Sequence, residues 1–166
     1  HPRIQFQRPY HESIDDCVDS LMQESAHWTV SELSTLAIAH EGYQPDAIAQ
    51  RNKADRAKRI MSQYLSTHPQ DAYICSKLGG LYHAQGQVSE AIEILEQGLR
   101  QPVLEPAVVY ELNYHLGLTY TAAEQLSLAQ QHYEQALGVD LPIPLKLAAY
   151  INLAALYTQQ GQCSEA

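Results

Sequence analysis

A pattern of one large residue, one small residue and, three positions later, one tyrosine occurs three times in the C-terminal hundred residues of this 166-residue chain. The second copy follows the first by 38 residues, and the third follows the second by 37. The copies are Leu78-Gly79-x-x-Tyr82, Leu116-Gly117-x-x-Tyr120 and Leu153-Ala154-x-x-Tyr157. Twelve positions after the small residue of each copy stands another, at Ala91, Ala129 and Ala166. A steady period of this length indicates stacked copies of one supersecondary unit.

The composition of each copy predicts a pair of closely packed helices. Glycine inside a helix is less favourable than alanine by ~1 kcal/mol, so Gly79 and Gly117 at equivalent positions indicate a close contact between helices. Turn signals occur at residues 85–87 and 160–162, and prolines mark the junctions between copies. The sequence therefore predicts a mainly α fold, a superhelix built from helical hairpins.

This pattern resembles the tetratricopeptide repeat (TPR) over about residues 72–166. The resemblance implies repeats at 71–105, 106–142 and 143–166. The third is truncated, because its second helix would begin only at the end of the sequence. We therefore expect the chain to be part of a longer protein. The uncovered face of the third repeat would then be completed by a continuation, or by a neighbouring copy in a homo-oligomer.

Tetratricopeptide repeats usually receive a peptide or another domain in a concave groove, so the resemblance implies a protein partner. Family members that bind chaperone tails clamp a terminal carboxylate with Lys, Arg and Asn, and we expect no such clamp here. Eight residues are expected by register to face the groove: Tyr73, Ser76, His83, Glu111, Tyr114, Leu118, Thr121 and Thr158. The alternative is that they are ordinary solvated surface. An acidic, tyrosine-rich lining favours neutral or basic segments.

The N-terminal residues follow a different pattern. Alternation at residues 3–7 and 36–40 predicts two short strands, and Ser13 is a good cap for a helix with an apolar face between them. We expect residues 1–44 to be a short α/β remnant of a separate domain. Residues 45–70 are expected to form a helix that links this remnant to the repeats at 71–166 and caps them.

The succession of motifs over nearly the whole chain suggests a second resemblance. It consists of His11-Glu12, Ile38-x-His40-x-Gly42-Tyr43, a basic helix from Arg51 to Arg59, and the segment from His68 to Tyr73. The chain looks like the C-terminal part of a bacterial, often cyanobacterial, family-2 glycosyltransferase with a TPR tail. That resemblance implies a GT-A catalytic domain, a nucleotide-sugar donor and a divalent metal, Mg or Mn, for the parent protein. The parent's own catalytic domain would be a further partner of the repeats.

The chain itself is expected to bind rather than to catalyse. The Asp-x-Asp motif that holds the metal in such enzymes does not occur in the sequence, so we assign no catalytic residue to it. His11, oriented by Glu12, is the candidate to join the parent's metal or diphosphate. The alternative is a hydrogen-bonded pair in a strand-to-helix turn. His40 is a weaker candidate of the same kind.

Charge and cysteine content exclude several other classes. The formal charge of −9 and the sequence pI of about 5.2 make non-specific nucleic-acid binding unfavourable. Three cysteines without a C-x-x-C pair fit a reducing, cytoplasmic location, and no apolar run is long enough to span a membrane. A basic stretch at 51–71 has five cations and two acids, and separates two acidic blocks. It is either a solvated helix face or a contact for phosphate groups or an acidic neighbouring domain.

Two hypotheses therefore remain for the function. In the first, the chain is the protein-binding tail of a glycosyltransferase. In the second, it is a stand-alone TPR adaptor, or scaffold, whose N-terminal segment is an irregular cap. The predicted strands at 3–7 and 36–40 distinguish them, because a pure adaptor should be helical throughout.

Overall fold

A computed structural model describes residues 15–24, 27, 29, 53–159 and 161. The elements in these residues are all helices: α1 (Asp15–Glu24), α3 (Lys53–Thr67), α4 (Ala72–Ala84), α5 (Val88–Leu99), α6 (Pro106–Ala122), α7 (Leu126–Leu137) and α8 (Ile143–Gln159). The mainly α prediction is confirmed for this part of the chain. The predicted strands at 3–7 and 36–40 lie outside the described residues and stay predictions.

The chain divides into two compact units, His1–Tyr64 and Leu65–Ala166. The first contains α1 and most of α3, and the second contains α4 to α8. The predicted domain boundaries at 44/45 and 70/71 stay predictions. In the first unit, α1 buries Leu21, and α3 buries Ala57 and Met61 on its apolar side.

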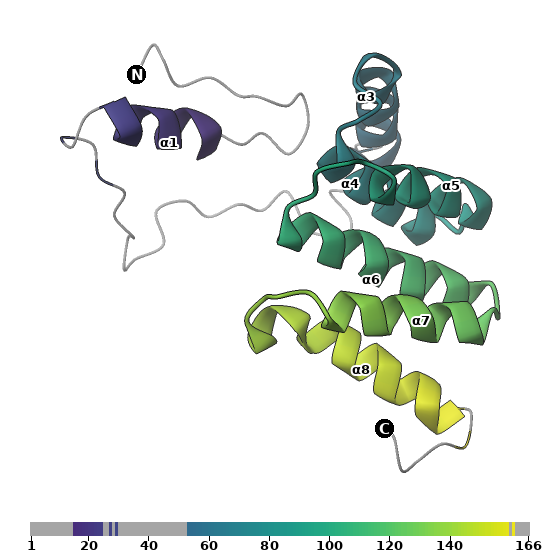
Figure 1. Cartoon of the computed structure of the whole chain (residues 1–166). Coiled ribbons are helices and arrows are strands. Elements are labelled where there is room, and N and C mark those ends of the chain that lie inside the picture. Colours follow the sequence, from purple (N-terminus) through teal and green to yellow (C-terminus); the bar gives the residue numbers. More distant parts are fainter. Residues whose placement is uncertain (1–14, 25–26, 28, 30–52, 160, 162–166) are drawn as a thin grey trace. The chain divides into compact units, whose positions relative to one another are not determined.

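The second unit is a stack of antiparallel helical hairpins (Figure 1). Helices α4 and α5 form the first hairpin, α6 and α7 form the second, and α8 packs on α7 and α6. Local signals in the sequence account for where α4 and α6 begin. The Asp71 side chain accepts a hydrogen bond from Ile74 N at 3.0 Å, and Pro106 opens α6, where its missing N–H is no loss.

One turn geometry recurs at the end of each first helix. Gly86 follows α4 with φ of 72°, and Gly161 follows α8 with φ of 75°. Glu124 holds the equivalent place after α6, with φ of 59°, although it has a side chain. In each turn the backbone N–H of the residue with positive φ donates to the carbonyl three residues earlier. Gly86 N, for example, donates to His83 O at 2.9 Å. The left-handed conformation therefore belongs to the repeat rather than to glycine alone.

The repeated small and large residues form the core between paired helices. A side chain at Gly79 would collide with Leu95, and one at Gly117 would collide with Tyr133. The two glycines therefore allow α5 to pack closely on α4, and α7 to pack closely on α6. The signature leucines and the small residues of the second helices are buried as well: Leu78, Leu116, Leu153, Ala91, Ala129 and Ala136. The close-packing interpretation of the sequence signature is confirmed.

Two of the three signature tyrosines, Tyr120 and Tyr157, connect a first helix to the second helix that precedes it. The Tyr120 hydroxyl donates to Glu96 Oε1 at 3.1 Å, from α6 to α5. One repeat later the Tyr157 hydroxyl donates to Glu134 Oε1, also at 3.1 Å, from α8 to α7. The same side-chain pair thus recurs at the same register, and it holds successive first helices against the preceding second helices.

Candidate partner-binding face

The eight residues predicted to face a groove lie on α4, α6 and α8, the first helices of the three repeats. We call their shared surface the first-helix face. Tyr73, Ser76 and His83 lie on α4, Glu111, Tyr114, Leu118 and Thr121 lie on α6, and Thr158 lies on α8. Ser76 is fully buried, Thr158 is exposed, and the other six are half-buried.

The structure brings Tyr73, Ser76 and Glu111 together around Lys77. Lys77 Nζ lies 2.7 Å from Glu111 Oε1 and 2.6 Å from Oε2, and 4.8 Å from the centre of the Tyr73 ring. Ser76 Oγ lies 2.9 Å from Glu111 Oε2 and 2.8 Å from Tyr73 O, so its single proton is shared between two acceptors. The only carboxylate among the eight residues is therefore neutralised across the α4–α6 contact.

A second cluster lies further along the same two helices. The ring of His115 on α6 fills the space over Gly80, where an added Cβ would lie 2.8 Å from His115 Cε1. Its Nδ1 is buried without a hydrogen-bond partner among the described residues. Burial lowers the pKa of His115 to about 4, so the ring is neutral at physiological pH. His83 Nδ1 lies 3.3 Å from Thr119 Oγ1, and burial also lowers the pKa of His83.

Tyr114 lies at the centre of an aromatic group on α6. Its ring stacks on Tyr110 with centroids 5.9 Å apart, and lies 6.4 Å from the Tyr133 ring. Asn152 Nδ2 on α8 donates to the Tyr114 hydroxyl at 3.5 Å. Tyr114 thus connects the first-helix face of the second repeat with that of the third.

The remaining predicted residues are less connected. Thr121 donates to Gly117 O at 2.8 Å and lies 3.3 Å from the Tyr133 hydroxyl, which holds it toward α7. Thr158 donates to Ala154 O on its own helix, and Leu118 is half-buried on α6. The structure does not bring Thr158 into either cluster.

Sequence reasoning missed three polar residues of this face, Lys77, His115 and Asn152. Ser76, Tyr114 and Ile151 occupy equivalent positions in the three copies, and the three missed residues directly follow them. The repeat register was therefore the signal that could have found them. Lys77 changes the interpretation most. The face is not acidic where Glu111 lies, because the Lys77 ammonium is paired with that carboxylate.

The described residues offer no sign of metal chemistry or of an activated thiol. They hold no group of three or more His, Cys, Asp or Glu side chains placed to bind a metal ion. His11, the predicted metal residue, and His40 lie outside them and stay predictions. Cys75 is fully buried, and burial raises the pKa of its thiol to about 11, so it acts as a small packing residue. Within the described helices, none is long and apolar enough to cross a membrane.

Comparison with known proteins agrees with the repeat architecture. Residues 49–109 and 110–141 each match a profile described as tetratricopeptide repeat. A TPR repeat-containing protein of Synechococcus elongatus is 43% identical over 161 residues, which cover 97% of this chain and 40% of that protein. The chain therefore spans well under half the length of this relative. A crystal structure of MamA superposes with a TM-score of 0.58 at 23% identity, covering 76% of this chain and 68% of MamA, and shows likeness of fold alone.

Proposed function

Because residues 49–141 belong to the tetratricopeptide-repeat family, we propose that the chain is a protein-interaction module that binds a partner segment on the first-helix face. The observation that carries this proposal is the row of half-buried polar and aromatic side chains on successive first helices. Tyr73, Lys77 and Glu111 begin the row, and Tyr114 and Asn152 continue it. Half-buried Tyr and His side chains offer apolar contact area together with polar groups at low entropic cost.

The electrostatics of the face favour an uncharged segment. Lys77 and Glu111 neutralise one another, and His83 and His115 have lowered pKa values, so they add no charge near neutral pH. A strongly charged peptide would have to compete with the Lys77–Glu111 pair for either partner. We therefore favour a neutral segment that presents aromatic or amide side chains to Tyr73 and Tyr114.

A peptide library displayed on phage and selected on the whole chain tests this proposal. Selected neutral peptides should bind the wild type, and Tyr73→Ala and His83→Ala should each weaken them by about tenfold, the effect expected of one interface anchor. Tyr114→Phe, which keeps the ring and removes the hydroxyl near Asn152, should weaken binding less. The matched control is Glu93→Ala, an exposed change on α5. Equal binding by Tyr73→Ala, His83→Ala and the wild type would show that the face is not the site.

A second proposal concerns a longer parent protein. The order of the motifs from His11-Glu12 to Tyr73 supports a glycosyltransferase with Mg or Mn at its own catalytic domain, and this rests on the sequence alone. The Synechococcus relative is described by its repeats, which agrees with the alternative of a stand-alone adaptor. The test is metal-dependent hydrolysis of nucleotide-sugars by the full-length product. If the full-length product lacks an Asp-x-Asp motif and does not hydrolyse nucleotide-sugars, the stand-alone adaptor is the remaining hypothesis.

Self-association is a further partner proposal. Helix α8 exposes apolar side chains at positions whose equivalents in α6 are buried or half-buried. Tyr110 is 9% exposed, whereas Leu147 at the same register is 56% exposed, and Ile151, the equivalent of Tyr114, is 60% exposed. A second copy that covers this face would remove the apolar surface from water. A cytoplasmic location also stays a proposal, supported by the cysteine content.

A further inference from the structure

Helix α3 concentrates positive charge in an acidic protein. Its sequence has four cations, Lys53, Arg56, Lys58 and Arg59, against one carboxylate, Asp55, which gives +3 over Lys53–Thr67. Residues 68–159 have three cations and nine carboxylates, which gives −6. The positive charge is therefore local, and it belongs to one helix.

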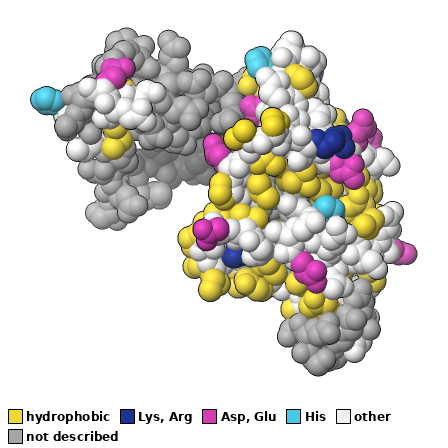
Figure 2. Space-filling view, in the orientation of Figure 1, with side chains coloured by type: hydrophobic (Ala, Val, Ile, Leu, Met, Phe, Trp, Pro, Cys, Tyr) yellow, Lys and Arg dark blue, Asp and Glu magenta, His cyan; other side chains and the backbone are white. Residues whose placement is uncertain are grey.

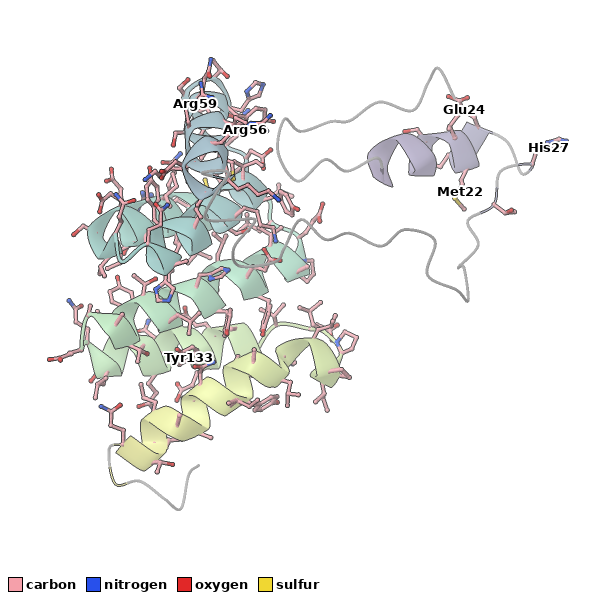
Figure 3. The ribbon with its side chains drawn as sticks, turned by 180° about the vertical axis from the view of Figure 1, so that it is seen from behind. Met22, Glu24, His27, Arg56, Arg59 and Tyr133 are labelled. Carbon is pink, nitrogen blue, oxygen red and sulfur yellow. The ribbon has the colours of Figure 1, made fainter. Side chains whose placement is uncertain are left out.

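Two of the four cations on α3 have no partner among the described residues. Lys58 Nζ lies 3.8 Å from Asp55 Oδ1, so the single carboxylate of the helix is already engaged. Arg56 and Arg59 are exposed, and their side chains make no ion pair or hydrogen bond within the part of the chain that the structure describes. They stand three positions apart, so they share one side of the helix, and Figure 3 shows both side chains extending from α3.

The cations of residues 68–159 behave differently. Lys77 pairs with Glu111, and Arg100 Nη1 lies 3.5 Å from Glu96 Oε2. Lys146 Nζ donates to Leu137 O at 2.8 Å and to Val139 O at 3.0 Å, next to the C-terminal end of α7. On the face drawn in Figure 2, cations occur at isolated points among carboxylates. Arg56 and Arg59 are the exception to the pairing seen elsewhere in the described residues.

Stability of α3 itself does not account for this placement. All four cations lie in the first two turns of the described helix, where the macrodipole favours anions, and its last turn has no basic residue. The side chains therefore add to the positive potential of the helix N-terminal half instead of offsetting it. A carboxylate brought from outside would be stabilised mainly by the two guanidinium groups, because the effect of the macrodipole falls off within the first turn.

We propose that the Arg56–Arg59 side of α3 docks an acidic segment of a partner protein. Guanidinium groups hold carboxylates through two parallel hydrogen bonds, and two neighbouring guanidiniums suit two carboxylates on one short segment. Nucleic acid fits less well, because it requires many phosphate contacts and the chain has a net charge of −9. This docking side lies on α3 and has no residue in common with the first-helix face.

Fluorescence anisotropy with the whole chain tests the proposal. The probe is a labelled peptide of alternating glutamate and serine, and its glutamine analogue is the control ligand. The acidic peptide should bind and the analogue should not, with affinity falling as salt is raised. Arg56→Gln with Arg59→Gln should weaken binding by about tenfold, as expected for loss of two charged contacts. Arg100→Gln, which removes an exposed but paired cation, should leave binding unchanged.

Three results would overturn the assignment. The first is that the acidic peptide fails to bind the wild type. The second is equal affinity for the wild type and the Arg56→Gln, Arg59→Gln variant, with circular dichroism showing that both are folded. The third is binding of a labelled single-stranded oligonucleotide of equal charge as tightly as the peptide, which would point to phosphate rather than carboxylate. Because Tyr73→Ala alters only the first-helix face, its binding of the acidic peptide should match the wild type.

Discussion

Gly117 on α6 lies directly against the ring of Tyr133 on α7. A methyl group at Gly117 would come within 2.5 Å of Tyr133 Cδ1 and Cε1, and Tyr133 is itself almost fully buried. The ring cannot move aside without disturbing the packing of α6 on α7. The same relationship holds one repeat earlier between Gly79 and Leu95. The two pairs set how closely the helices of each hairpin approach.

Gly117→Ala should therefore destabilise the protein. Alanine favours the helix by ~1 kcal/mol, but overpacking against Tyr133 should reverse this and lower the free energy of unfolding by about 1–3 kcal/mol. Urea unfolding followed by circular dichroism measures the change. The control is Gly138→Ala, since an added Cβ there has no neighbour closer than 3.5 Å and should leave stability within about 0.5 kcal/mol of wild type. If Gly117→Ala proved as stable as Gly138→Ala, the close contact would not limit the packing.

Glu124→Gly should stabilise the protein. Glu124 holds a left-handed conformation with φ of 59°, which glycine adopts without the penalty of roughly 1 kcal/mol that a side chain incurs. The reverse change, Gly86→Ala at φ of 72°, should destabilise by a similar amount although open space surrounds it. Thermal unfolding of both variants checks the pair. A fall in stability for Glu124→Gly would mean that the glutamate makes contacts that outweigh its backbone strain.

Acid should weaken the repeat unit through His115. The pKa of His115 is lowered by burial from 6.5 to about 4, so the unfolded chain binds a proton that the folded chain refuses. The stabilisation is fully present above about pH 6.5 and is lost as pH falls to about 4, which amounts to roughly 3 kcal/mol. Glu111, which opposes the shift, and His83 and Lys77, which reinforce it, are its charged neighbours.

Urea midpoints of wild type and His115→Gln across this range measure the effect. The variant should lose less stability on acidification, while His68→Gln, an exposed histidine, should behave as wild type does. His83 and His132 also have pKa values lowered by burial, so some acid sensitivity should persist in the variant. Identical acid sensitivity of His115→Gln and wild type would contradict the prediction.

Replacing the exposed apolar side chains of α8 should reduce self-association. Leu147→Gln with Ile151→Gln removes two large apolar groups that are more than half exposed. Sedimentation equilibrium should show a weaker concentration dependence of mass than in the wild type, with little change in stability. Leu128→Gln on α7 is the matched control. A wild type that is monomeric at all concentrations would remove the self-association proposal.

The repeat signature predicted more of the structure than the choice of site residues did. Leu78, Gly79 and Ala91 are buried where the hairpin interpretation placed them, because one packing solution is repeated and each copy reports on the others. The partners of Glu111 were not predictable in the same way. The carboxylate meets Ser76 and Lys77 of another helix, 35 and 34 residues away, and no local pattern distinguishes a neutralised carboxylate from a free one.

The sequence by itself determined the helical hairpins, their period and their turns, since helix packing and left-handed turns demand small residues at set places. It also determined that positive charge is concentrated on one helix. Only the tertiary structure decided which charges remain available. Lys77 and Arg100 pair with carboxylates and Lys146 donates to backbone carbonyls, whereas Arg56 and Arg59 have no partner among the described residues. Local spacing accounts for the pairs Arg100–Glu96 and Lys58–Asp55, which stand four and three positions apart. The partners of Lys77 and Lys146 depend on distances of a few ångströms between atoms of different helices, which spacing along the chain does not specify.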